Sequence, residues 1–113
     1  MIRSEEILHR FHGSATTTRW GASFFPVAVA VEILRECRTS DIAMIGIEGN
    51  EVLGNQVGAR SDLIFDLSQR GSSSWSEFRD ACNDEAEKVL KGLMAERDVM
   101  LWVTLMSAAE YRC

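Results

Sequence analysis

The sequence predicts an α/β chain of the α+β type, with a small mixed sheet of three to four strands packed with two to three helices. A length of 113 residues fits one domain, over 1–113, and 46% hydrophobic with 26% charged residues is typical of a globular chain. Apolar residues recur at helical spacing over 75–95, and apolar runs at 41–48 and 98–106 have the length of strands. The expected order is α-α-β-(β)-β-α-β.

A short first helix is expected in SEEILHRF, which begins at Ser4 as a cap and places Ile7, Leu8 and Phe11 on one side. Residues 12–23 are rich in small and hydroxyl side chains, which favours a loop.

A second helix is expected at about 24–38. The valines of PVAVAVEILREC alternate as in a strand, but the same apolar residues also follow helical spacing. Pro26 suits the first turn of a helix, where its missing N–H costs nothing, and EILREC consists of good helix formers. The helical interpretation is therefore preferred.

Two strands are expected next, at 41–48 (DIAMIGIE) and at 62–67 (DLIFDL), and they are expected to pair. The stretch between them is polar and rich in glycine. Gly49-Asn50, flanked by IE and EV, has the composition of a tight hairpin turn, so this stretch is itself expected to be partly extended and antiparallel.

The clearest helix begins with a capping box, in which the Ser74 hydroxyl accepts from the third amide and Glu77 reaches back to the cap. Its apolar residues continue to Met94 and predict an amphipathic helix over 75–95. The segment DVMLWVTLM is apolar on both strand faces, which predicts an interior strand at 98–106 covered on both sides. A helical crossover makes this strand parallel to 62–67, and the sheet therefore mixed.

Net charge indicates the class of partner, and cysteine usage indicates the compartment. The net charge is −5, which disfavours a surface that follows nucleic-acid phosphates and favours a basic partner. Cys37 and Cys82 lie at apolar helix positions and, with Cys113, fit free thiols in the cytoplasm. No metal-ligand spacing, cofactor motif, export signal or membrane span is recognised, and a monomer is expected.

The stretch 46–66 is the candidate functional region, because long connections in small domains are often functional. Its carboxylates fit a solvated edge and an acidic recognition surface about equally. A small hydrolase or transferase that uses them with His9 or His12 is one alternative function. A structural module that oligomerises through its sheet edge is another.

The arrangement of WGASFFPVAVAVEILREC and TSDIAMIGIEG, then DLIFDLS, SWSEFRDACNDEA and a hydrophobic C-terminal strand, resembles small bacterial immunity proteins. These are the inhibitors encoded beside colicin-type and contact-dependent growth inhibition toxins. The resemblance runs through most of residues 20–106 as a pattern, without a catalytic signature. It implies an acidic, cytoplasmic, non-enzymatic protein that binds the C-terminal domain of a cognate toxin, expected to be a basic nuclease.

The expected toxin-binding residues follow from position and chemistry, since no family motif fixes them. Carboxylates are expected to pair with toxin Arg or Lys, amides to form hydrogen bonds, and an indole to pack against the toxin. The residues are Glu48, Asn50, Glu51, Asn55, Arg60, Asp62 and Trp75.

Overall fold

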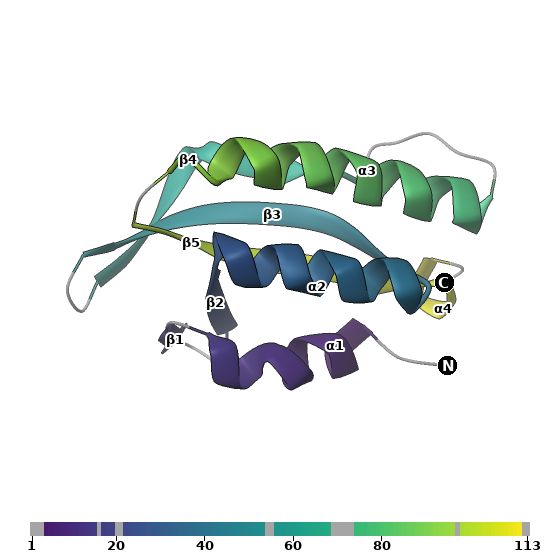
Figure 1. Cartoon of the computed structure of the whole chain (residues 1–113), viewed down its shortest axis with the longest axis horizontal. Helices are drawn as coiled ribbons and strands as arrows, with labels where there is room; N and C mark the ends of the chain where they lie inside the picture. Colours follow the sequence, from purple (N-terminus) through teal and green to yellow (C-terminus); the bar gives the residue numbers. More distant parts are fainter. Residues whose placement is uncertain are drawn as a thin grey trace.

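The computed structural model describes residues 4–15, 17–19, 22–53, 56–68, 74–96 and 98–111, and it confirms the predicted α+β class (Figure 1). One five-stranded sheet has the order β1-β2-β5-β3-β4, and all neighbouring strands are antiparallel. The strands are β1 (Thr17–Arg19), β2 (Ala22–Pro26), β3 (Ile42–Leu53), β4 (Gln56–Asp66) and β5 (Val99–Ser107).

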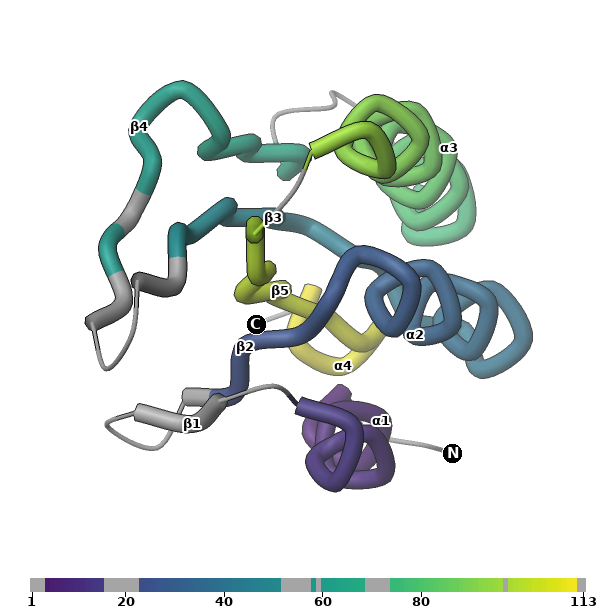
Figure 2. Tube along the Cα trace, turned by 60° about the vertical axis from the view of Figure 1, so that its left-hand side comes forward, coloured from purple at the N-terminus to yellow at the C-terminus, as the bar shows by residue number. Residues whose placement is uncertain are grey.

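The three longer helices lie on one side of this sheet, and two short helices complete the set (Figure 2). They are α1 (Ser4–Phe11), the 3-10 helix η1 (His12–Ser14), α2 (Val27–Thr39), α3 (Trp75–Leu93) and the short α4 (Ala108–Tyr111). Figure 2 shows α1, α2 and α3 along the same side of the strands. We call the opposite side of the sheet the uncovered face.

The core fills the space between the helices and the sheet. The predicted cap at Ser74 forms: its hydroxyl accepts from the Glu77 amide at 3.2 Å, and α3 starts at Trp75. The side chains of Cys37 and Cys82 are fully buried, as predicted. The other core residues are mostly aliphatic, and include Ile33, Leu34, Ile42, Met44, Ile47, Ala86, Leu90, Leu101, Val103 and Leu105.

The prediction of a mixed sheet is wrong. β4 and β5 do run in the same direction, as the crossover requires, but β3 lies between them and is antiparallel to both. The crossover rule fixes the relative direction of two strands and leaves open whether a third strand separates them. The hairpin partner β3 occupies that central place.

The expected boundary at residue 24 is also wrong. Phe24, Phe25 and Pro26 belong to β2, and α2 begins at Val27. Phe25 pairs with Leu101 of β5 and is 1% exposed, so pairing across the sheet decides the conformation that local propensity left open. The loop expected at 12–23 contains η1, β1 and the start of β2.

The turn predicted at Gly49-Asn50 is wrong as well. β3 continues to Leu53, which pairs with Gln56, and residues 54 and 55 lie outside the described part of the chain. The register shifts between Glu48 and Asn50, which marks a bulge in the hairpin. A Cβ atom on Gly49 would lie 2.6 Å from the Cβ of Leu63. Glycine, which has no Cβ, therefore allows β4 to approach β3 this closely.

The expectation that β5 is covered on both sides is wrong. Burial alternates along the strand: Leu101, Val103 and Leu105 face the core, whereas Trp102 and Thr104 are exposed. β5 is therefore interior to the sheet, and its central part has one face toward the helices and one toward solvent.

Candidate functional site

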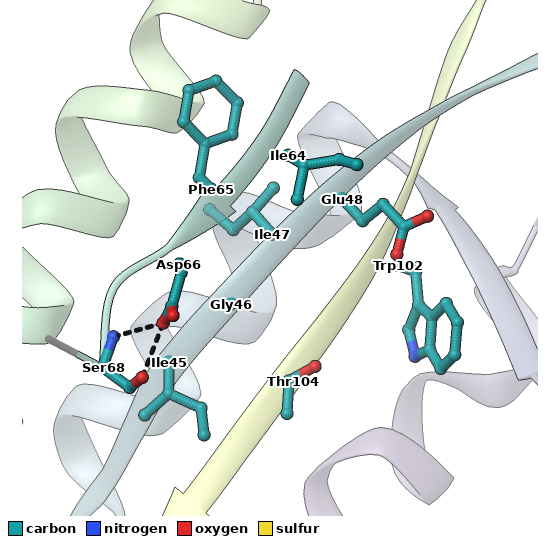
Figure 3. Close-up of a pocket in the computed structure, with 10 residues that line it drawn as sticks. All are labelled: Ile45, Gly46, Ile47, Glu48, Ile64, Phe65, Asp66, Ser68, Trp102 and Thr104. Atoms are coloured by element: carbon teal, nitrogen blue, oxygen red, sulfur yellow. Dashed lines mark hydrogen bonds between the residues drawn. The ribbon is translucent and has the colours of Figure 1, made fainter. Parts of the chain in front are cut away.

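Three side chains form a row across the uncovered face. Glu48 of β3 is directly opposite Ile64 of β4 on one side and Trp102 of β5 on the other. Directly opposed residues of antiparallel strands have Cβ atoms about 4.5–5.5 Å apart. Figure 3 shows the Glu48 carboxylate between Ile64 and the indole of Trp102. Ile64 is 55% exposed and Trp102 is 46% exposed, so the row places two large apolar groups in solvent.

Trp102 is held in place from its other side. The buried ring of Phe24 meets the indole edge-on, with ring centroids 6.4 Å apart at 69°. Edge-to-face packing of this kind stabilises an aromatic pair by about 0.5–1.5 kcal/mol. The exposed indole is therefore positioned by β2 before any partner binds.

A second row lies beside the first. Asp66, Gly46 and Thr104 are opposed across the same three strands, and together with the first row they line a shallow pocket of about 290 Å³ (Figure 3). Gly46 keeps this pocket open, because it has no side chain. We call it the Glu48 pocket; its six main residues are Ile64, Glu48, Trp102, Asp66, Gly46 and Thr104.

The charges in the Glu48 pocket are negative. Within the described part of the chain, the Glu48 carboxylate makes no hydrogen bond or ion pair. The Asp66 carboxylate accepts hydrogen bonds from the Ser68 amide at 2.9 Å and from the Ser68 hydroxyl, and so holds the chain where β4 ends. The described residues that line the pocket include no Lys, Arg or His. The arrangement therefore favours a cation.

Three of the predicted toxin-binding residues form a separate ion cluster. Arg60 donates to both carboxylate oxygens of Asp62, at 2.7 and 3.3 Å, and lies 3.7 Å from Glu51 and 3.6 Å from Glu96. The hydrogen bond from Arg60 lowers the pKa of Asp62, and the same bond raises the pKa of Arg60. Arg60 is thus occupied by carboxylates of its own chain.

The remaining predicted residues lie elsewhere. Asn50 is 4% exposed, and its amide donates to the Glu48 carbonyl at 3.0 Å, so its visible role is to support the bulge. Asn55 lies outside the described residues. The structure therefore does not bring the predicted set together into one site.

Trp75 belongs to a small aromatic cluster at the start of α3. Its ring packs on Tyr111 and Phe78, with centroids 5.3 and 6.0 Å away, and its indole N–H donates to Asp41 at 2.8 Å. Packing at the end of the sheet accounts for its position.

The histidines considered for catalysis lie apart from the Glu48 pocket. His9 lines a hollow with Glu5, Glu6 and Arg10 on α1, and His12 has its Nδ1 2.9 Å from the Ser23 hydroxyl. Within the described residues, no group of three or more His, Cys, Asp or Glu is arranged to hold a metal ion.

A second hollow of about 320 Å³ lies between α2 and α3, where Leu34 and Leu90 contribute apolar surface and the exposed Met94 stands at one side. The charged side chains around it are already paired: Arg38 lies 3.1 Å from Asp84, and Lys91 lies 3.7 Å from Glu87. This hollow lacks the unpaired charge that distinguishes the Glu48 pocket.

Sequence reasoning found Glu48 and missed its neighbours Ile64, Gly46, Trp102 and Thr104. The available signal was the difference between the two faces of β5. Leu101, Val103 and Leu105 are purely aliphatic, whereas the alternate positions carry an indole with a polar N–H and a hydroxyl. That difference distinguishes a half-buried strand from one that is covered on both sides.

Comparisons of the chain with protein-family models, with curated proteins and with solved structures found no match. Among the described residues, no helix has the length and apolar character needed to cross a membrane.

Proposed function

We propose that this chain is a bacterial immunity protein, which binds the C-terminal domain of a cognate toxin and neutralises it by contact. The pattern of sequence segments that resembles immunity proteins is one support for this proposal. Under this proposal, the toxin domain is a basic nuclease, the complex forms in the cytoplasm, and no catalytic group of this chain takes part.

The observation that carries the proposal is the row Ile64–Glu48–Trp102. Tryptophan is enriched among the residues that dominate binding energy, and such anchors work best beside groups that exclude water. Here an exposed indole and an exposed aliphatic side chain flank a carboxylate without a partner in the described residues. A protein surface with a cation between apolar groups would complement this row.

The charge of the whole chain supports the same partner. A net charge of −5 attracts a basic domain over a distance of about one Debye length and raises the rate of association. The ion cluster of Glu51, Asp62, Glu96 and Arg60 has three carboxylates for one guanidinium, so it adds to the negative field. Glu51 and Asp62 therefore remain predicted contributors to the association rate.

The test is coexpression in bacteria with the toxin domain encoded by the neighbouring gene. We expect growth to be rescued by the unmodified chain, and the two proteins to copurify as a complex. Trp102→Ala should weaken the complex at least about tenfold, the effect of an interface residue that contributes more than about 1.4 kcal/mol. Glu6→Gln on α1, which lies away from the row, should leave the affinity unchanged.

Two results would count against the proposal. One is a neighbouring gene that encodes no toxin, together with a failure of the chain to rescue growth from any toxin domain of the same genome. The other is rescue of growth without copurification of the two proteins. That result would indicate that the chain acts catalytically on a product of the toxin's activity, and it would favour the small-enzyme alternative.

A further inference from the structure

The Glu48 pocket has the features of a site for one planar cation. Two carboxylates, of Glu48 and Asp66, stand in neighbouring rows of the uncovered face, and the indole of Trp102 borders the space between the rows. Ile64 provides an aliphatic wall on the other side (Figure 3). Carboxylates and an aromatic face are the two groups that hold a basic side chain in proteins.

We propose that the Glu48 pocket binds the side chain of a single arginine presented by the partner. In this arrangement the guanidinium lies against the Trp102 indole and donates to the Glu48 carboxylate. Its aliphatic stem packs on Ile64. The Asp66 carboxylate, already held by Ser68, adds a second negative charge beside the cation. This inference rests on the proposed function for the source of the arginine, but the pocket itself can be tested alone.

Arginine fits this pocket better than lysine for a geometric reason. A guanidinium is planar, so it stacks on an indole and still directs N–H groups in its own plane toward carboxylates. An ammonium is a compact and strongly hydrated charge, so its desolvation in a pocket walled by Ile64 and Trp102 costs more free energy than that of a guanidinium. The exposed, preformed indole thus selects the flatter and less hydrated cation.

Gly46 determines whether the pocket has room for such a side chain. A Cβ atom at Gly46 would lie 3.5 Å from the Cβ and hydroxyl of Thr104, which is ordinary van der Waals contact. Alanine at this position therefore fits the fold and takes up space on the floor of the pocket. This makes Gly46→Ala a steric probe that leaves both carboxylates and the indole in place.

The first experiment uses the chain alone and titrates it with N-acetyl-arginine amide, followed by NMR of the backbone amides and the indole N–H groups. We expect saturable shifts at Gly46, Glu48 and the Trp102 indole, with a dissociation constant in the millimolar range. N-acetyl-lysine amide should bind several-fold more weakly. Shifts spread evenly over the acidic surface, or equal binding of the two amides, would overturn the proposal.

Variants then assign the contacts. Glu48→Gln keeps the size of the side chain and should weaken binding of the arginine amide about three- to tenfold, as expected for loss of a partly exposed charged hydrogen bond. Gly46→Ala should weaken it as well. Glu6→Gln, the charge-matched control on α1, should bind like the unmodified chain. Unaltered binding by both Glu48→Gln and Gly46→Ala would refute the assignment.

A second experiment separates this inference from the proposed function. If the toxin domain binds the chain but Glu48→Gln and Gly46→Ala leave its affinity unchanged, the arginine assignment is wrong and the immunity proposal stands. If the arginine amide binds as expected but no toxin domain does, the pocket stands and the immunity proposal is wrong. In a complex that satisfies both, one toxin arginine changed to lysine should reproduce the loss seen with Glu48→Gln.

Discussion

The side chain of Asn83 on α3 completes the hydrogen bonding of β3 at Met44. Its Oδ1 accepts from the Met44 amide at 2.8 Å, and its Nδ2 donates to the Ile42 carbonyl at 3.0 Å. β4 stops pairing at Asp66, opposite Gly46, so the amide group of Asn83 takes the place of a neighbouring strand. It thereby fixes α3 against β3, the strand that carries Glu48.

Replacing Asn83 with alanine should destabilise the fold strongly. Asn83 is 1% exposed, and two buried backbone groups would lose their partners, at about 1–3 kcal/mol each. We expect urea denaturation to show a loss of about 2–6 kcal/mol in the free energy of unfolding, and amide exchange at Met44 to accelerate. Asp84→Ala, at the adjacent exposed position, should cost about 1 kcal/mol or less. Equal losses for both variants would contradict this role of Asn83.

Gly49→Ala and Gly58→Ala form a matched pair within the β3–β4 hairpin. A Cβ at Gly49 would lie 2.6 Å from the Leu63 Cβ, whereas a Cβ at Gly58 meets nothing within 4 Å. Overpacking at Gly49 should cost about 1–3 kcal/mol in the free energy of unfolding. Gly58→Ala should change it by about 0.5 kcal/mol or less. Thermal or urea unfolding measures both, and a harmless Gly49→Ala would show that the bulge does not need glycine.

Ile64→Thr should separate binding from stability. Ile64 is largely exposed and threonine keeps the β-branched shape, so the free energy of unfolding should change by less than about 1 kcal/mol. Leu101→Ala, in the buried face of β5, should lose about 2–5 kcal/mol. Ile64→Thr should nevertheless weaken the proposed complex with a toxin domain, measured by calorimetry. Strong unfolding by Ile64→Thr would mean that Ile64 serves the fold instead.

Cys37 should be unreactive in the folded protein. Burial, with a smaller effect from the Glu36 carboxylate, raises the pKa of the Cys37 thiol from 9.0 to about 12. The thiolate is the form that reacts with iodoacetamide, so mass spectrometry at pH 8 should find Cys37 labelled only after unfolding. Rapid labelling of the native chain would show that α2 opens readily.

The same shift gives a pH dependence with a defined sign. Because the pKa of Cys37 is higher in the folded state than in the unfolded state, its contribution to stability is complete below pH 9 and is lost as pH rises toward 12. We therefore expect the unfolding free energy of the unmodified chain to fall more steeply over this range than that of Cys37→Ala. Parallel curves would contradict the shift.

Asp41 joins the end of α2 to the start of α3 and should respond differently to glycine and alanine. Its backbone φ is 59°, and its carboxylate accepts from the Trp75 indole and from Arg79. Both substitutions remove the acceptor, but only alanine is strained at this φ. Asp41→Ala should therefore be less stable than Asp41→Gly by about 1 kcal/mol in urea unfolding. The reverse order would indicate that backbone freedom in the unfolded state outweighs the strain.

The sequence by itself predicted the elements whose signals are local. Residues 75–95 have helical periodicity and a capping box, and α3 begins at the predicted residue. The buried thiols, the α+β class and the parallel direction of β4 and β5 also followed from patterning and the crossover rule. The net negative charge and the choice of Glu48 as a candidate site residue also came from the amino-acid sequence without the structure.

Tertiary structure decided what depends on contacts between distant segments. The pairing of Phe25 with Leu101 made residues 24–26 a strand, and the place of β3 between β4 and β5 made the sheet antiparallel throughout. The gathering of α1, α2 and α3 on one side left Trp102 in solvent, although β5 is almost entirely apolar. Ile64, Glu48 and Trp102 are far apart in sequence, and only the register of three strands places them in one row. Local sequence indicates which residues are able to be buried, whereas the covering of each sheet face is set by where the helices pack.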